Sequence, residues 1–229
     1  MDETRAPVLD PGKRKTKTGY FWALARDDRP WGGTASPGVA FTYAPGLSGQ
    51  FSDDILKGFS GIFQVDGYAG YNRLLKRADD QVALAYCWAH ARRKLHKVAQ
   101  SGTAPNAAFE AWLTTNRAQL SAKAPLGKAL KYIAKYWDGL CLFLTDGRIE
   151  MDSNAVERAI RPITLNRKNA LFAGHDAGAT NWGVIASLVE TCKLNTVGPH
   201  AYLARNLTAT VAGHNQSQIN ELLPWNYVK

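Results

Sequence analysis

The chain has 229 residues, with 28 lysines and arginines against 19 acidic residues, which gives a formal net charge of +9. A hydrophobic fraction of 45% and an aromatic fraction of 10% exclude a disordered chain, because disordered chains lack the apolar side chains that form a core. No apolar run approaches the roughly 20 residues of a membrane-spanning helix. The basic excess favours a polyanionic partner, most simply nucleic acid, although a merely basic soluble protein also fits.

The three cysteines, Cys87, Cys141 and Cys192, are far apart in the sequence and form no CxxC pair. Their spacing suggests neither a zinc-binding motif nor a disulfide framework. The N-terminus is acidic and polar and does not resemble a secretory signal peptide. We therefore expect a protein of the reducing cytoplasm.

Three strands in series are predicted near the N-terminus. Residues 4–9 and 19–26 are short apolar stretches, separated by a turn signal at 10–12 and the basic segment KRKTK at 13–17. Residues 39–43 predict the third strand. Short connections between consecutive strands are typical of an antiparallel meander. The basic segment is either a solvated hairpin loop or a contact for DNA phosphates.

A strand–turn–helix pattern follows. Helical spacing at 48–59 precedes a short apolar strand at 62–66, a GYAGY turn and a helix near 71–77. The strand ends in Asp66, and functional groups of βα units collect at the carboxyl ends of strands. Residues 82–87 predict another buried strand.

A basic helix is predicted at 88–100, and its Arg92 and Arg93 are candidates for phosphate contact. Two further helices, at 109–120 and 126–144, interrupt the α/β pattern and are interpreted as an insertion. The second of them carries an apolar stripe that indicates packing rather than a ligand site: Leu130, Ile133, Ala134, Trp137, Leu140, Cys141 and Leu144.

The segment 149–175 follows the insertion. It begins with capping residues at 152–154 and continues as a short helix that carries Glu157. Arg161 lies one turn after this acid, so an ordinary solvated face with i,i+4 ion pairs is one interpretation. Pro162 should bend or end the helix.

Helices are then predicted at 178–193 and from residue 199 to about 211. The apolar and aromatic tail at 219–229 should dock onto the fold rather than extend into solvent.

Three acids stand out by their positions. Asp2 stands at the start of the first strand, Asp66 ends the fourth, and Glu157 lies on a helix after the insertion. The order β-β-β-α-β-α-β followed by a late helix is that of a ribonuclease-H-like α/β fold, a mixed sheet with flanking helices. The first and fourth strands are neighbours in that fold, so we expect the three carboxylates to form one cluster.

Such a cluster suits metal-dependent phosphodiester chemistry. Two Mg²⁺ ions about 3.5–4 Å apart can stabilise both the attacking and the leaving oxygen. Mg²⁺ prefers carboxylate and water oxygens. Without a cation, three acids placed together would repel one another.

Several segments, in chain order, carry a resemblance to a known family: MDETRAPVLDPGKRKTKTGYFWALARDDRPWGG, QVDGYAGYNRL, CWAHARRK, MDSNAVERAIRP, NRKNALFAG and ELLPWNY. They resemble the insertion-sequence-66 family of bacterial DDE transposases over essentially the whole chain. The resemblance implies that Asp2, Asp66 and Glu157 are the catalytic acids and metal ligands. It also implies Mg²⁺ dependence, with Mn²⁺ substituting, and cutting and strand transfer at the ends of a mobile element.

The resemblance further implies a ribonuclease-H-like catalytic domain at 1–186, with a helical insertion at about 101–148, and a small C-terminal region at 187–229. Its partners would be mobile-element ends and target DNA, and a homo-oligomer would hold two DNA ends. Six basic residues are expected to hold phosphates, mostly without reading bases: Arg92, Arg93, Arg158, Arg161, Arg167 and Lys168.

Members of the family carry further segments upstream of the first acid, whereas this chain starts at Met1. We therefore expect a truncated copy with a shortened first strand. One alternative is a catalytically inert remnant that binds DNA by charge alone, with Asp2 in a frayed strand. Another is a self-standing ribonuclease-H-like nuclease, in which the segments GYFWALAR and ELLPWNY would have no special role.

Overall fold

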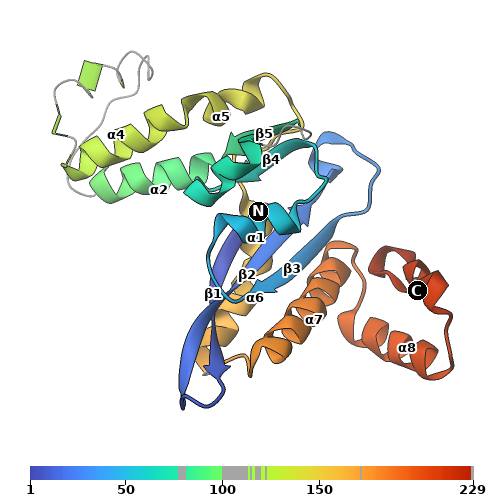
Figure 1. Ribbon diagram of the computed structural model, residues 1–229. Helices are drawn as coiled ribbons and strands as arrows, with labels where there is room; N and C mark the ends of the chain where they lie inside the picture. The colour runs from blue at the N-terminus through green and yellow to red at the C-terminus, as the bar shows by residue number, and fades with distance from the viewer. Residues whose placement is uncertain are drawn as a thin grey trace. The chain divides into compact units, whose positions relative to one another are not determined.

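The computed structural model describes residues 1–76, 81–99, 113, 115–116, 120–121, 123–170 and 172–227 (Figure 1). They belong to two compact units, which are described separately. Unit 1 comprises residues 1–51 and 154–229, and unit 2 comprises residues 52–153. Both units mix helices with strands, as the α/β assignment predicts. Among the described residues, no helix has the length and apolar character needed to cross a bilayer.

The sheet of unit 1 consists of β1 (Asp2–Asp10), β2 (Lys15–Arg26) and β3 (Gly38–Ala44), in the order β1-β2-β3. Both pairings are antiparallel, so the predicted meander is confirmed. β2 begins at Lys15, and therefore part of the basic segment expected in a loop is strand. β1 is paired from Asp2 to Asp10, so the frayed first strand of the inert-remnant alternative is not found.

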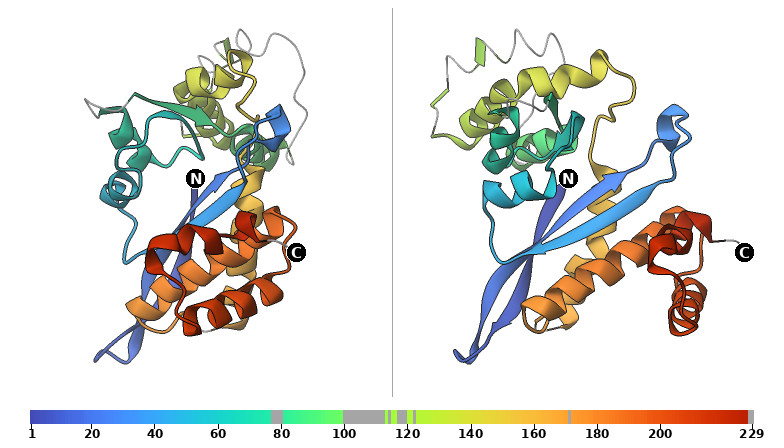
Figure 2. Two further views of the ribbon diagram at one scale, coloured as in Figure 1. Left: turned by 90° about the vertical axis from the view of Figure 1, so that its right-hand side faces the viewer. Right: turned by 45° about the vertical axis from the view of Figure 1, so that its right-hand side comes forward.

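Two helices, α6 (Asn154–Asn169) and α7 (Asp176–Leu194), pack on one face of this sheet. Alternate residues of the strands face them, as a side-chain period of two requires. Figure 2 shows α7 running beside β3. The unit 1 core is formed by small and β-branched side chains around two phenylalanine rings: Ala6, Val8, Phe21, Ala23, Val39, Phe41, Val156, Ala159, Ile160, Ile163 and Ala179.

Pro162 does not end α6, which continues to Asn169, so of the two expected outcomes, a bend or an end, the end is wrong. Proline has no N–H, so the carbonyl of Arg158 loses its helical donor. On either side of the proline, Ile160 and Ile163 are buried in the unit 1 core. Their packing offsets the lost hydrogen bond, because tertiary contacts commonly override local propensity.

The C-terminal part of unit 1 contains α8 (Pro199–Val211) and two short 3₁₀ helices, η4 (Gln216–Leu222) and η5 (Pro224–Asn226). The phenol of Tyr202, on α8, donates to the carbonyl of Leu222 at 2.7 Å. The predicted docking of the tail is therefore confirmed. The expected boundary between residues 186 and 187 falls inside α7, and that division into domains stays a prediction.

Unit 2 is built around two parallel strands, β4 (Gly61–Val65) and β5 (Val82–Tyr86). The chain between them contains η2 (Ala69–Lys76), a 3₁₀ helix at the position of the helix expected near 71–77. The preceding helix α1 (Gly49–Ile55) begins in unit 1 and is shorter than predicted. Glycine 58, with a φ of +75°, reverses the chain soon after it.

The predicted basic helix is α2 (Trp88–Ala99). The helix expected at 109–120 lies largely outside the described residues. The helix expected at 126–144 divides into α4 (Pro125–Lys135), α5 (Trp137–Cys141) and the 3₁₀ turn η3 (Leu142–Leu144).

The described helices of the expected insertion pack in the unit 2 core. Gly139 of α5 lies so close to β5 that an added Cβ would be 2.5 Å from the carbonyl oxygen of Leu84. Leu130, Ile133 and Leu140 are fully buried, as their stripe predicts. Leu144, the last residue of that stripe, is 72% exposed, because the helix has ended before it.

Candidate functional site

Asp66 directly follows β4 and is the first residue of the turn that leaves the sheet. Its Oδ1 accepts a hydrogen bond from the N–H of Tyr68 at 2.9 Å, which is an Asx turn. Within the described parts of the chain, no group donates to its Oδ2. The carboxylate is only partly buried. It therefore has an oriented side chain with one oxygen available to a cation.

Two tyrosines of the helical segment hold the backbone on either side of this turn. The phenol of Tyr132 donates to the carbonyl of Asp66, and the phenol of Tyr136 donates to the carbonyl of Gly67 at 2.9 Å. Burial, followed by the charge of Asp66, raises the pKa of Tyr132 well above its usual value. This phenol therefore remains a hydrogen-bond donor throughout the physiological pH range.

The ring of Tyr136 continues the contact to β5. It lies 4.3 Å from the ring of Tyr86, measured between centroids. Burial and the nearby Tyr136 raise the pKa of Tyr86 to about 12. The Asp66 turn is thus fixed by β4, which it directly follows. Tyr132 and Tyr136 bind its backbone, and the ring of Tyr136 contacts the ring of Tyr86 on β5.

Asp2 lies at the start of β1, opposite Ala23 of β2. Directly paired residues of antiparallel strands carry their side chains on the same face. Ala23 belongs to the face covered by α6 and α7, so Asp2 points to that face as well. Its Oδ1 accepts the N–H of Glu3 at 2.8 Å. A hydrogen bond from Arg167 of α6 to Thr4 Oγ1, at 3.2 Å, supports this assignment of the face.

Glu157 lies in the first turn of α6, next to the buried Val156. The following Arg158 contributes to lowering the pKa of Asp27, after the larger effect of the hydrogen bond from Arg29. Asp27 follows the end of β2, so the first turn of α6 lies near that end of the sheet. Arg161 forms no ion pair with Glu157 in the described structure, and the i,i+4 interpretation fails for this pair.

Asp2 and Glu157 therefore lie at the same end of the unit 1 sheet, on the face that α6 covers. Asp66 belongs to unit 2. A cluster of all three acids stays a prediction.

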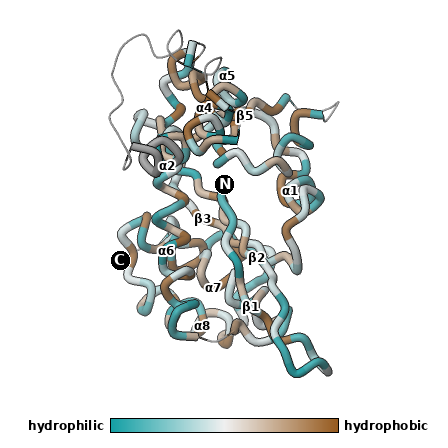
Figure 3. The backbone as a smooth tube through the Cα atoms, turned by 90° about the vertical axis from the view of Figure 1, so that its left-hand side faces the viewer, coloured by the Kyte–Doolittle hydropathy of each residue, from teal (hydrophilic) through white to brown (hydrophobic). Residues whose placement is uncertain are grey.

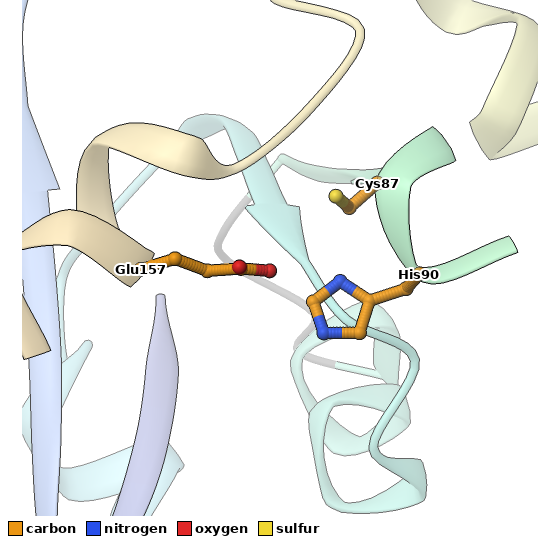
Figure 4. Close-up of side chains that lie close together, drawn as sticks. All are labelled: Cys87, His90 and Glu157. Carbon is orange, nitrogen blue, oxygen red and sulfur yellow. The ribbon is translucent and has the colours of Figure 1, made fainter. Parts of the chain in front are cut away.

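Cys87, between β5 and α2, forms a polar contact that the sequence did not suggest. Burial alone would raise the pKa of its thiol, but hydrogen bonds involving His90 and Ser153 hold that pKa below its usual value. The N–H of Ser153 donates to Cys87 Sγ at 3.2 Å. Figure 4 shows Cys87 and His90 at the start of α2, and Glu157 on α6.

This contact is one of three that fix the last residues of unit 2, directly before α6. Gln64 Nε2 donates to the carbonyl of Glu150 at 2.6 Å, and the N–H of Trp88 donates to the carbonyl of Met151 at 2.9 Å. The chain that leads into the Glu157 helix is therefore held by β4, by the end of β5 and by α2.

The six predicted phosphate-binding residues are all exposed: Arg92, Arg93, Arg158, Arg161, Arg167 and Lys168. Arg167 also has a structural role, because its Nη1 donates to the carbonyl of Arg5 at 2.8 Å. No sequence signal pointed to Tyr132 or Tyr136, and Ser153 was expected only as a capping residue. The i,i+4 spacing of the tyrosines shows only that they share a helix face.

The protein-family comparison covers nearly the whole chain. The model described as "Transposase IS66 family" matches residues 1–108 and 103–181, and the "IS66 C-terminal element" matches residues 187–225. No solved structure matches the chain.

Three similar proteins come from Sinorhizobium fredii (strain NBRC 101917 / NGR234), and all are named as uncharacterized. Protein y4qI is 38% identical over 270 residues, covering 99% of this chain and 50% of its own length. Protein y4jD is 36% identical over 269 residues, covering 99% of this chain and 53% of its own. Protein y4hP is 31% identical over 278 residues, with coverages of 99% and 50%. The chain thus spans about half the length of these relatives, and it belongs to the IS66 family of transposases.

Proposed function

We propose that this chain is the catalytic part of a DDE transposase, which cleaves phosphodiester bonds at the ends of a mobile element and transfers the strands. Asp2, Asp66 and Glu157 would hold two Mg²⁺ ions, with Mn²⁺ as a substitute. When bound, such ions stabilise the charge that develops on the attacking and leaving oxygens. The proposal rests on family membership together with the positions of the three acids.

The observation that carries the proposal is the placement of Asp2 and Glu157. They are separated by most of the sequence, yet they lie at one end of one sheet, on one face. A solvated charge pattern would not require this. Packing of α6 on β1 and β2 is what brings the two elements together.

The carboxylate oxygens of Asp66 suit a hard cation. Carboxylate oxygens are preferred ligands of Mg²⁺, and Oδ2 of Asp66 accepts no hydrogen bond among the described residues. The Asx turn and the two phenols hold the backbone around Asp66. This chain would therefore orient the ligand before a metal binds.

The strand arrangement supports the ribonuclease-H-like part of the proposal. β1, β2 and β3 form an antiparallel meander, and β4 is parallel to β5. In a ribonuclease-H-like sheet, the β1-β2-β3 meander and the β4-β5 pair would be two parts of one sheet, joined by pairing of the first and fourth strands. We expect that pairing in the active protein, where Asp2 and Asp66 would become neighbours.

The exposed arginines of α2 and α6 would hold DNA phosphates, and a homo-oligomer would bring two DNA ends together. The alternative, an inert remnant that binds DNA by charge, depends on an Asp2 that is out of place. The paired β1 does not favour that alternative. Metal binding distinguishes the two functions.

Calorimetric titration with Mn²⁺ tests the proposal. The wild type should bind, and Asp66→Asn should lose most of the binding heat because an amide oxygen carries no charge. Asp138→Asn is a matched control, since Asp138 is an exposed acid of the same unit on α5. It should bind as the wild type does. Absence of binding in the wild type would favour the inert remnant.

The hydrogen bond from Tyr132 to the carbonyl of Asp66 gives a second prediction. Tyr132→Phe should lower the free energy of unfolding by about 1 kcal/mol, as for a typical buried hydrogen bond. It should also weaken Mn²⁺ affinity, because the Asp66 turn loses a support. Urea unfolding and calorimetry measure the two effects.

Tyr202→Phe is the control, because Tyr202 makes the same type of bond, to the carbonyl of Leu222 in the C-terminal part. It should cost similar stability and leave Mn²⁺ affinity unchanged. Equal losses of affinity in both variants would show that Tyr132 acts through general stability alone.

A further inference from the structure

The β1–β2 hairpin extends beyond the three-stranded sheet. β1 pairs with β2 from Asp2↔Ala23 to Asp10↔Lys15, whereas β3 pairs only with Tyr20–Arg26. The part of β2 before Tyr20 therefore has a strand on one side only. This two-stranded ribbon is visible at the blue end of the chain in Figure 1.

The ribbon is held firmly at its base. The N–H of Ala173 donates to the carbonyl of Pro7, and the N–H of Leu9 donates to the carbonyl of Gly174, at 2.8 and 2.7 Å. Lys17 Nζ lies 2.7 Å from Asp176 Oδ2 at the start of α7. These contacts fix the direction in which the ribbon leaves the unit.

Beyond this base, the tip carries positive charge. Residues 11–16 are all exposed and include Lys13, Arg14 and Lys15. Lys13 lies 3.2 Å from Asp10, which leaves a net charge of +2 from three cations and one acid. Arg14 and Lys15 form no ion pair within the part of the chain that the structure describes.

The conformation of the turn presents these side chains outward. Gly12 has a φ of +83° and Arg14 a φ of +48°, so two left-handed residues reverse the chain tightly. A non-glycine residue in this region is uncommon. The turn places consecutive basic residues at the outermost point of the ribbon.

The composition of the tip suits phosphate rather than a protein surface. Figure 3 shows a hydrophilic colour around the end of the hairpin. Protein interfaces are depleted of lysine and depend on aromatic or aliphatic anchors, whereas the exposed large hydrophobic side chain nearest in sequence to this turn is Leu9, at 38%. Lysine, arginine and threonine side chains are ordinary donors to nucleic-acid phosphates.

We propose that the tip of the β1–β2 ribbon, residues 13–15, binds the phosphate backbone of duplex DNA. A two-stranded ribbon fits the major groove, which is about 12 Å wide, and its outermost cations then reach the phosphates that line the groove. The proposal rests on the proposed function for the choice of DNA as the partner. It adds a contact surface on unit 1 that consists of residues other than the three acids and the arginines of α2 and α6.

Salt dependence of binding to a fluorescent, mixed-sequence 30-base-pair duplex tests this surface. The variant Lys13→Gln, Arg14→Asn, Lys15→Gln removes three charges, and asparagine tolerates the left-handed conformation at position 14. Each phosphate contact contributes about 0.9 to the slope of log affinity against log salt. The slope should therefore fall in magnitude by about 2–3, and affinity should fall with it.

The matched control is Lys123→Gln, Lys128→Gln, Lys131→Gln, which removes the same charge from exposed lysines in unit 2. Its slope should change by less than about 1. Equal changes in both triple variants would overturn the proposal in favour of bulk charge, and an unchanged slope in the tip variant would overturn it directly.

Asp66→Asn should keep the wild-type slope, and the tip variant should keep Mn²⁺ binding. Failure of the ribbon proposal is thus distinguishable from failure of the catalytic one.

Discussion

Replacement of Asp66 by Asn, or of Glu157 by Gln, should reduce metal-dependent cleavage of mobile-element-end DNA by about 10³-fold or more. Two-metal sites supply several kcal/mol of transition-state stabilisation, and about 4 kcal/mol corresponds to a factor of about 10³ in rate. Either substitution keeps the size of the side chain and removes one charged ligand. The cleavage rate is measured from end-labelled duplex, with Mg²⁺ and Mn²⁺ in separate reactions.

The loss should occur without a loss of DNA affinity, because the proposed phosphate contacts involve the arginines and the ribbon tip and not the acids. Asp138→Asn serves again as the control and should cleave at the wild-type rate. A variant of Asp66 or Glu157 with undiminished cleavage would contradict the catalytic assignment. Cleavage that persists in EDTA would contradict the role of the metal.

The local elements of this fold were largely predictable from the sequence. The strand at β3 and the helix α8 were predicted closely, because apolar periodicity and turn residues mark their limits. The length of α6 was not predicted closely. Pro162 is a local signal against a continuous helix, whereas the burial of Ile160 and Ile163 depends on tertiary packing. The length of β1 likewise depends on its partner β2, which pairs with it from Asp2 to Asp10.

The acids of the candidate site were predictable from the sequence, whereas the residues that hold the chain around them were not. Asp66 stood out because it ends an apolar run before a glycine turn. Tyr132 and Tyr136 lie far along the chain, and only the folded structure shows that both phenols reach the Asp66 turn. The bond from Ser153 to Cys87 joins residues 66 positions apart, and no short-range pattern signals such a pair.

Gly67→Ala should be strongly destabilising, with an expected loss of about 2–3 kcal/mol in the free energy of unfolding. Gly67 has a φ of +97°, where a side chain costs about 1–2 kcal/mol. An added Cβ would lie 2.8 Å from the hydroxyl of Tyr132 and 3.1 Å from its ring. Tyr132 would have to move, and its hydrogen bond to Asp66 would be lost, at a further cost of about 1 kcal/mol.

Gly58→Ala separates the two parts of that loss. Gly58 also lies in unit 2 with a positive φ, +75°, but an added Cβ there meets nothing within 4 Å. Urea unfolding should give about 1–2 kcal/mol for Gly58→Ala, from the backbone term alone. The excess in Gly67→Ala then measures the contact with Tyr132, and Mn²⁺ affinity should fall only in that variant. Equal losses of stability in the two variants would mean that Tyr132 can move without an energetic cost. Its role in holding the Asp66 turn would then be wrong.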